Sequence, residues 1–266
     1  MGARAWYDGL DHSGSWGQGV YGVETNKTTV SALIGRALEK GQTALSEFDG
    51  KRVFEAYGIP VVEERLAGSI DEAVAAADAL GYPVVVKACS PVLAHKTDAG
   101  LVTLNVMDAD CVRRAIETIA AAAGRTPLDG FLIQRMVEGQ REVIVGGLRD
   151  PLFGPCVMVG LGGVLVEAIA DVAFRLVPIE RLDALEMLAE LKGRRLFGAV
   201  RGEPPIDRDA TSDVLIAVGR ILDEQPTVAQ IDVNPIIFDG AQPVAVDALI
   251  TLARCNARAE RGGHGL

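Results

Sequence analysis

The sequence has little that would suit a nucleic-acid or membrane partner. It carries 36 acidic against 26 basic residues, a formal net charge of −10, and no basic run apart from scattered arginines near its C-terminus. A nucleic-acid-binding face must neutralise phosphates, so we expect no nucleic-acid partner. No apolar run reaches the roughly 18 residues of a membrane span, and no charged-then-apolar leader opens the chain. We therefore expect a soluble, cytoplasmic protein without membrane contact.

The sequence also lacks the short motifs of several common enzyme and metal-site classes. Its four cysteines form no C-x-x-C pair, which removes support for zinc or dithiol chemistry. No G-x-x-x-x-G-K-[S/T] segment occurs, so we exclude a P-loop. Gly17, Gly19 and Gly22 spell G-x-G-x-x-G, but no strand pattern precedes them, so we interpret them as part of a glycine-rich extension.

Hydrophobic patterning predicts an α/β protein in which helices are mixed with hairpin-like strand pairs. Hydrophobic residues make up 49% of the chain, which is enough for a sizeable core. We expect helices at 31–58, 70–80, 109–123, 180–192 and 210–223, and strands at 61–66, 84–87, 101–106, 131–136, 142–147, 156–159, 174–178, 228–238 and 244–249. A turn around Gly139 is predicted to join strands 131–136 and 142–147, and the turn 239–240 to join the last two.

Two features suit the binding of phosphate groups. Lys87 ends the apolar strand 84–87, and a buried ammonium needs a partner, which a phosphate or a structural carboxylate could supply. The segment 160–163, Gly-Leu-Gly-Gly, follows another apolar strand and could bring backbone N–H groups close to phosphate oxygens. A bulge or tight turn would use the same glycines, so spacing alone leaves both interpretations open.

Four further polar residues are candidates for chemistry. His95 lies in a polar loop and could be a nucleophile or proton carrier, or an ordinary surface histidine. Asn234 and Asp247 fall on the two arms of the last predicted strand pair, where hard oxygen donors suit Mg²⁺. Alternatively, Asn234 caps a turn and Asp247 is a solvated carboxylate. Glu142 begins a strand and could reach a metal or a ribose hydroxyl, or face solvent.

Taken together, these segments resemble one family. The segments that carry the resemblance are 56–61 (Ala-Tyr-Gly-Ile-Pro-Val), 83–87 (Pro-Val-Val-Val-Lys), 95–100 (His-Lys-Thr-Asp-Ala-Gly), 160–163 with Glu167 and Asp171, and 231–235 (Ile-Asp-Val-Asn-Pro). From about residue 45 to 252 the chain resembles the ATP-grasp subunit of ADP-forming acyl-CoA (acetate–CoA) ligases. It resembles the beta subunit of succinyl-CoA synthetase more distantly. Each segment is modestly specific, whereas their common order over most of the chain is highly specific.

The resemblance implies an ATP-grasp fold of two lobes with ATP or ADP bound between them. The nucleotide-binding residues that it implies are Lys87, Gln134, Met136, Glu142, Gly162 and Gly163. Lys87 would hold phosphates, and Gln134 and Met136 would lie at the inter-lobe hinge beside the adenine. Asn234 and Asp247 match the Mg²⁺ ligands of the family. His95 matches a histidine that these ligases are thought to phosphorylate as a relay.

The resemblance also implies how the chain is organised and what it does. The implied boundaries are an extension (1–40), an ATP-grasp domain (41–253) whose small lobe spans about 67–133 and whose large lobe spans about 134–253 plus 45–66, and a tail (254–266). The implied reaction is phosphoryl transfer between ATP or ADP and a phosphohistidine during interconversion of acyl-CoA and carboxylate. An acid–thiol ligase of this kind works with a CoA-binding, alpha-type subunit in a hetero-oligomer.

Two other functions stay open from the sequence. ATP-grasp folds also serve carboxylate–amine ligases, which attack an acyl phosphate with an amine; these need no phosphohistidine, so His95 argues against them. The chain could also be a nucleotide-sensing regulatory module without catalysis. The presence of both the phosphate-binding and the metal-binding candidates favours the synthetase.

Overall fold

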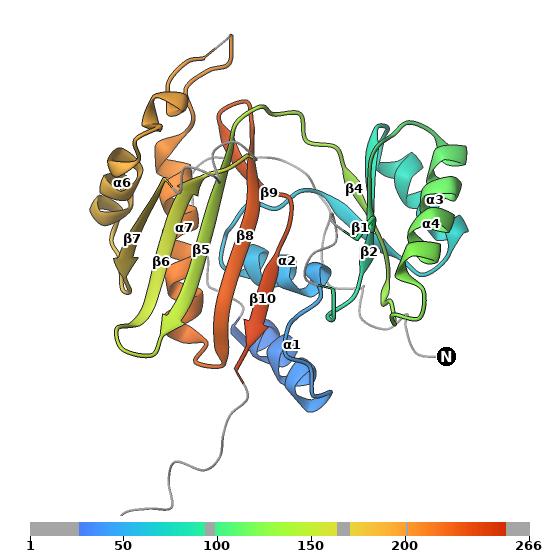
Figure 1. Cartoon of the computed structure of the whole chain (residues 1–266), viewed down its shortest axis with the longest axis horizontal. Coiled ribbons are helices and arrows are strands. Elements are labelled where there is room, and N and C mark those ends of the chain that lie inside the picture. The colour runs from blue at the N-terminus through green and yellow to red at the C-terminus, as the bar shows by residue number, and fades with distance from the viewer. Residues whose placement is uncertain (1–26, 94–98, 164–170, 201, 254–266) are drawn as a thin grey trace, which may run out of the picture.

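Two antiparallel sheets, each with its own helices, make up the part of the chain that the structure describes (Figure 1). The computed structural model describes residues 27–93, 99–163, 171–200 and 202–253. The smaller sheet has the strand order β1–β4–β2–β3, and the larger has the order β10–β8–β5–β6–β7 with β9 paired to β8. This architecture confirms the predicted α/β class.

The smaller unit consists of the smaller sheet and two helices. Its elements are β1 (Glu64–Ala67), α3 (Ile70–Leu80), β2 (Val84–Cys89), β3 (Val102–Val106), α4 (Ala109–Ala123) and β4 (Gly130–Arg135). Ser69 and Asp108 cap the helices, because their side chains accept the backbone N–H groups of Glu72 and Cys111 at 3.2 and 2.7 Å. Helix α3 buries alanines against the sheet, α4 buries larger side chains such as Ile116 and Ile119, and β2 is buried along its whole length.

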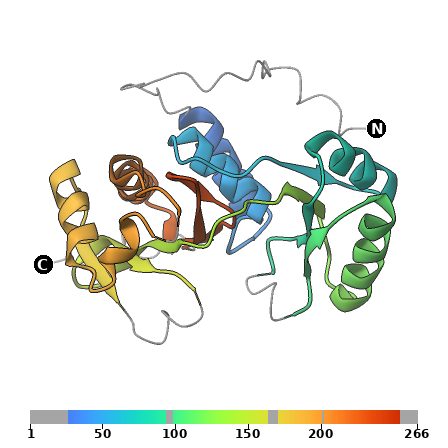
Figure 2. The ribbon, with the colours of Figure 1, turned by 90° about the horizontal axis from the view of Figure 1, so that it is seen from above.

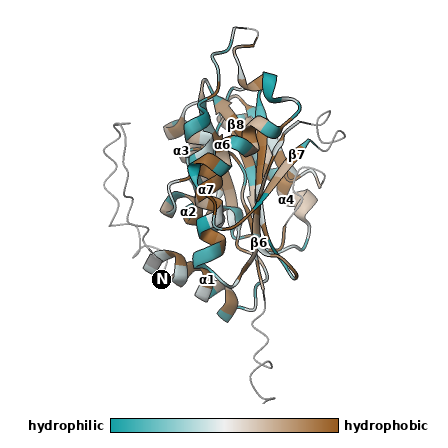
Figure 3. Ribbon diagram, turned by 90° about the vertical axis from the view of Figure 1, so that its left-hand side faces the viewer, coloured by the Kyte–Doolittle hydropathy of each residue, from teal (hydrophilic) through white to brown (hydrophobic). Residues whose placement is uncertain are grey.

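The larger unit combines the larger sheet with the first two and the last two helices. Its elements are α1 (Lys27–Glu39), α2 (Glu47–Ala56), β5 (Glu142–Asp150), β6 (Gly154–Leu161), β7 (Val172–Leu176), α6 (Arg181–Glu190), α7 (Arg208–Glu224), β8 (Val228–Asp239), β9 (Gln242–Ala245), β10 (Leu249–Leu252) and the 3-10 turn Arg194–Phe197. One continuous core joins the sheet to α1, α2 and α7. Figure 3 shows the strands of the larger sheet as mainly hydrophobic, whereas its helices have a hydrophobic and a hydrophilic side. None of the described helices is both long and apolar enough to cross a membrane.

The two units meet beside α2, which lies between the sheets in both views (Figures 1 and 2). The connection from β4 to β5 passes from the smaller to the larger sheet, so the two strands expected on either side of Gly139 are present but do not pair with each other. β4 pairs with β1 and β2, whereas β5 pairs with β6 and β8. Alternation in the sequence predicts a strand but not the neighbour with which that strand pairs.

The helix predicted for 31–58 is wrong in its continuity, since the chain forms the separate helices α1 and α2. Between them the backbone pairs with β10: Ala44 bridges Thr251, and the N–H of Leu45 donates to the carbonyl oxygen of Ile250 at 2.9 Å. This long-range pairing interrupts an otherwise helical pattern.

Two predicted strands differ in extent. The strand expected at 61–66 begins at Glu64 and, as β1, pairs with β4, so residues 64–66 lie in the smaller sheet and not in the larger lobe. The strand expected at 244–249 is divided into β9 and β10, which pair with opposite ends of β8. The segment between β9 and β10 is where the candidate residue Asp247 lies.

Candidate functional site

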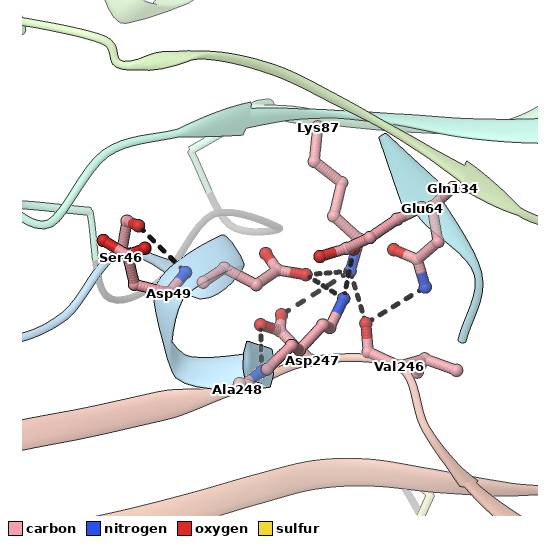
Figure 4. A network of polar contacts seen from close by, with 10 residues as sticks. Ser46, Asp49, Glu64, Lys87, Gln134, Val246, Asp247 and Ala248 are labelled. Carbon is pink, nitrogen blue, oxygen red and sulfur yellow. Dashed lines mark hydrogen bonds and ion pairs between the residues drawn. The ribbon is translucent and has the colours of Figure 1, made fainter. Parts of the chain in front are cut away.

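Lys87 connects the two units. Its Nζ atom donates to Oε1 of Glu47 at 2.9 Å and to the carbonyl oxygen of Val246 at 2.8 Å, and it lies 3.9 Å from Oδ2 of Asp247 (Figure 4). Lys87 belongs to β2 of the smaller unit, whereas Glu47 begins α2, and Val246 and Asp247 follow β9 of the larger unit. The structure therefore gives this buried ammonium the carboxylate partner that the sequence left open, beside a candidate metal ligand.

A second buried lysine extends this contact. Nζ of Lys51 donates to the same Oε1 of Glu47 at 2.8 Å and to Oε2 of Glu64 at 2.7 Å. Burial lowers the pKa of Lys51, but the charges of Glu47 and Glu64 outweigh it, so that pKa lies above its ordinary value. Burial raises the pKa of Glu64, and the nearby Lys51 opposes part of that rise. We call Glu47, Lys51, Glu64 and Lys87 the charged quartet.

Gln134 lies opposite Glu64 in the register of β1 and β4. Its Nε2 donates to the carbonyl oxygen of Val246 at 3.1 Å, so this carbonyl accepts from both Gln134 and Lys87. Within the described residues, Oε1 of Gln134 and Oε1 of Glu64 are buried and have no hydrogen-bond partner. Unpaired buried acceptors are costly, so a donor from a ligand or a water molecule would stabilise this place.

Met136 opens the connection between the units. It follows β4 directly, and its backbone N–H donates to the carbonyl oxygen of Pro83, which precedes β2, at 3.3 Å. The pairing of β4 with β2 ends at Arg135, so the carbonyl group of Met136 lies beyond it. Gln134 and Met136 therefore lie where the chain leaves the smaller sheet for the larger one, and Gln134 adjoins the charged quartet.

Asn234 and Asp247 lie on adjoining segments of the larger sheet. Ile236 of β8 pairs with Ala245 of β9, and Asp232 of β8 pairs with Leu249 of β10, so the same register continues from β9 to β10. Between these pairs the N–H of Val246 donates to the carbonyl oxygen of Pro235 at 3.2 Å, and Asn234 therefore lies opposite Asp247. Asn234 is exposed and the Asp247 side chain is 34% exposed, so both can reach a ligand. Their oxygen donors fit Mg²⁺, which would take its other ligands from water and phosphate oxygens.

The described residues contain no group of three or more His, Cys, Asp or Glu side chains that could hold a metal by themselves. A Mg²⁺ ion at Asn234 and Asp247 would therefore depend on a bound ligand for several of its oxygens. Sharing of this kind is typical of Mg²⁺ held through substrate phosphates.

The glycine segment at the end of β6 touches the start of β5. The N–H of Gly162 donates to the carbonyl oxygen of Glu142 at 2.9 Å, and a Cβ atom on Gly162 would lie 2.8 Å from the Cβ of Glu142. Gly163 has a φ of +94°, a conformation that L side chains rarely adopt. Close packing and backbone conformation thus require both glycines. Residues 164–170, which follow them, lie outside the described part of the chain.

His95, with Lys96, Thr97 and Asp98, lies outside the described residues. The segment 94–98 joins β2, which carries Lys87, to β3. Glu47, Lys51 and Glu64 were not among the functional residues predicted from the sequence. The spacing of Glu47 and Lys51, four residues apart in a helix, was the available signal, but this spacing is also common on solvated helix faces.

Most of the chain matches a known protein family. Residues 36–252 match the family described as ATP-grasp domain, so the chain is an ATP-grasp protein, with a fold that binds nucleotide. Acetate–CoA ligase [ADP-forming] I subunit beta of Pyrococcus furiosus is 43% identical over 212 residues, which cover 78% of this chain and 91% of that subunit. The chain therefore belongs to the family of ATP-grasp (beta) subunits of ADP-forming acetate–CoA ligases.

Two further matches are a longer ligase and a solved structure with bound ligands. Acetate–CoA ligase [ADP-forming] I of Archaeoglobus fulgidus is 41% identical over 226 residues; the match covers 84% of this chain but only 33% of that longer protein. A solved structure of dinucleotide-forming acetyl-coenzyme A synthetase 1 of Ca. Korarchaeum cryptofilum contains coenzyme A and Mg-AMPPCP, with its phosphohistidine segment pointing towards the nucleotide-binding site. It aligns with a TM-score of 0.74 and 40% identity, covering 84% of this chain and 100% of that chain.

Proposed function

We propose that this chain is the nucleotide-handling subunit of an ADP-forming acyl-CoA ligase and moves a phosphoryl group between ATP or ADP and a phosphohistidine. One observation carries the proposal: Lys87 of the smaller unit contacts Val246, 159 positions later, and its ammonium lies 3.9 Å from Asp247. A phosphate-binding cation and a magnesium-type oxygen donor thereby lie together where the two units meet. Such a pair suits the phosphates of a nucleotide.

Each candidate residue has a role that its position supports. Lys87 offsets the charge of phosphate oxygens, while Gln134 and Met136 adjoin the base at the connection between the units. The buried Oε1 of Gln134 would accept a hydrogen bond from an amino group of the base. Glu142 and the segment Gly162–Gly163 lie side by side at the start of β5 and the end of β6, where the N–H of Gly163 could reach phosphate and Glu142 could reach ribose.

Asn234 and Asp247 would hold Mg²⁺. The ion, when bound, supplies positive charge that offsets the charge of phosphate oxygens. Because Nζ of Lys87 lies 3.9 Å from Oδ2 of Asp247, the lysine and a metal held by Asp247 would both be close to the phosphates. The protein then has to position the groups, since positioning and electrostatic stabilisation account for most catalysis of phosphoryl transfer.

The proposed transfer forms one bond and breaks one. A ring nitrogen of neutral His95 attacks the terminal phosphorus of ATP, a P–N bond forms, and the P–O bond to ADP breaks. The phosphorylated ring releases its remaining N–H proton to solvent. In the opposite direction a phosphate oxygen of ADP attacks the phosphohistidine, and the nitrogen leaves as the ring takes up a proton.

The proposal includes a CoA-binding partner subunit. The relative from P. furiosus is named a subunit beta, and the ligase of A. fulgidus has about three times the matched length in a single chain. The remaining part of such a ligase would form the acyl phosphate and bind coenzyme A. We expect this chain by itself to bind nucleotide and to make no acyl-CoA.

The test is to incubate the purified chain with Mg·ATP, with and without the CoA-binding partner, and to measure phosphate by intact mass. We expect an acid-labile, alkali-stable phosphate on the wild type and none on His95→Ala. If no mixture yields phosphate although Mg·ATP binds, a regulatory module is favoured instead. Amide formation that survives His95→Ala would favour a carboxylate–amine ligase.

A further inference from the structure

Two buried ion pairs cross from one unit to the other with opposite polarity. Helix α2 contributes a carboxylate at Glu47 and an ammonium at Lys51, one helical turn apart. The smaller sheet contributes an ammonium at Lys87 in β2 and a carboxylate at Glu64 in β1. Each charge of the helix therefore faces the opposite charge on the sheet.

Helix α2 belongs to the larger unit, so these ion pairs join the two units and are not contacts within one unit. Val53 and Phe54 of α2 are fully buried in the core that also contains the larger sheet. The apolar core of the smaller unit contains residues of β2 and β4 but none of α2 within the described chain. The ion pairs of the charged quartet thus hold the smaller sheet against a helix that is fixed to the larger one.

Burial makes these contacts sensitive to geometry. The side chains of Glu47, Lys51 and Glu64 are 0, 2 and 6% exposed. In such surroundings an ion pair is favourable only when its geometry and hydrogen bonds are good, because water cannot replace a lost partner. A shift of either unit would therefore separate charges that solvent does not reach.

The hydrogen bonds of Lys87 leave capacity for a ligand. An ammonium has three N–H donors, and the described structure uses two of them, one to Glu47 and one to the carbonyl oxygen of Val246. The third N–H of Lys87 is therefore available to a ligand, and Nζ lies 3.9 Å from Oδ2 of Asp247. Glu47 also pairs with Lys51, so its charge is shared and Lys87 keeps attraction for an anion.

We propose that Glu47, Lys51 and Glu64 are positioning residues for nucleotide binding, which fix Lys87 in place and set the two units against each other around the phosphates. The inference rests on the proposed role of Lys87 at the nucleotide. It goes beyond that role because the three residues act through Lys87 and need no contact with the nucleotide. Glu47 is the central residue, since both lysines donate to the same oxygen.

A double-mutant cycle on the full chain tests this inference. Isothermal titration with Mg·ADP is carried out on the wild type, Glu47→Gln, Lys87→Met and the double variant. We expect the Kd to rise about tenfold in Glu47→Gln, which keeps the shape of the side chain but loses its charge. We expect a rise of tenfold or more in Lys87→Met, and no further rise in the double variant.

Two outcomes would overturn the inference. Effects of Glu47→Gln and Lys87→Met that simply add would mean that Glu47 acts independently of Lys87. Tighter Mg·ADP binding by Glu47→Gln would mean that Glu47 competes with phosphate for the lysine. An unchanged Kd in Lys87→Met would instead remove the proposed phosphate site, so the two failures are distinguishable.

Stability controls separate positioning from general loss of structure. Ile119→Ala removes a fully buried side chain from the core of the smaller unit, and we expect lower thermal stability with an unchanged Kd for Mg·ADP. If Glu47→Gln fails to fold, Lys51→Met with Glu64→Leu, which removes a whole ion pair, takes its place in the cycle. Weakening that persists in the absence of Lys87 would contradict the inference in that version as well.

Discussion

Replacing Lys51 by methionine should destabilise the protein strongly, because it removes an ammonium that two buried carboxylates share. The Nζ atom lies 2.8 Å from Glu47 and 2.7 Å from Glu64 and is the only ammonium within the charged quartet that contacts Glu64. Methionine keeps most of the volume and leaves the carboxylates behind. Loss of one partner from a buried ion pair costs about 3–5 kcal/mol, and we expect the free energy of unfolding at pH 8 to fall by about that amount.

The loss should depend on pH, with a sign that follows from Glu64. Its pKa is raised above the ordinary value of 4.5 by burial, so the folded protein holds the proton more tightly than the unfolded chain. A raised pKa contributes stability that is fully present below the pKa of the unfolded chain and is lost as the pH rises through the folded pKa. Lys51 opposes the rise, so the variant should have a higher pKa at Glu64 and a larger deficit at pH 8 than at pH 5.

Urea unfolding followed by circular dichroism at both pH values measures the effect. The control variant combines Lys51→Met with Glu64→Leu, which removes a whole ion pair and leaves Glu47 with Lys87. We expect the control to regain most of the lost stability, because replacing a buried pair by apolar side chains is often close to neutral. A deficit below about 1 kcal/mol at pH 8, or an equal deficit at both pH values, would refute the argument, since exposed ion pairs contribute no more than that.

Three further predictions concern the nucleotide site. Lys87→Met should weaken Mg·ADP binding about tenfold or more in isothermal titration, since a hydrogen bond to a charged group contributes about 1.5–3 kcal/mol; unchanged binding would argue against a phosphate at this lysine. Asp247→Asn should lower the Mg²⁺ dependence of ADP binding while metal-free ADP binding persists, and an unaltered Mg²⁺ titration would contradict its role as a ligand. Gly162→Ala should lower the free energy of unfolding by about 1–3 kcal/mol, because the added Cβ atom would lie 2.8 Å from the Cβ of Glu142; chemical unfolding with Gly35→Ala, where the added atom meets nothing within 4 Å, is the matched comparison.

Local signals in the sequence predicted the elements whose ends are fixed by neighbouring residues. The helix predicted for 109–123 has those bounds because Asp108 caps it and Gly124 follows with a φ of +59°. Local pattern made Lys87 and Asp247 separate candidates, and the family resemblance assigned them to one nucleotide site, although they are remote in sequence. The structure then places the ammonium of Lys87 3.9 Å from the carboxylate of Asp247.

Long-range strand pairing accounts for the errors. An alternating pattern fixes which side chains share a face but carries no information about the neighbouring strand, so it did not show that strands 131–136 and 142–147 lie in different sheets. For the same reason the contacts of Glu64 could not be predicted from the sequence. Its position in β1 beside α2 follows from the pairing of β1 with β4, which nothing local in the sequence specifies.

Glu47 and Lys51 show why burial decides what a sequence pattern means. Glutamate followed by lysine four residues later in a helix contributes only about 0.2–0.5 kcal/mol when the pair is solvated. In α2 the same pair is almost fully buried, and each member also has a partner on the smaller sheet. A weak local pair thereby becomes part of a buried contact between the two units. Under the proposed role of Lys87, the polar residues of α2 that face the smaller sheet would affect nucleotide binding without contacting the nucleotide.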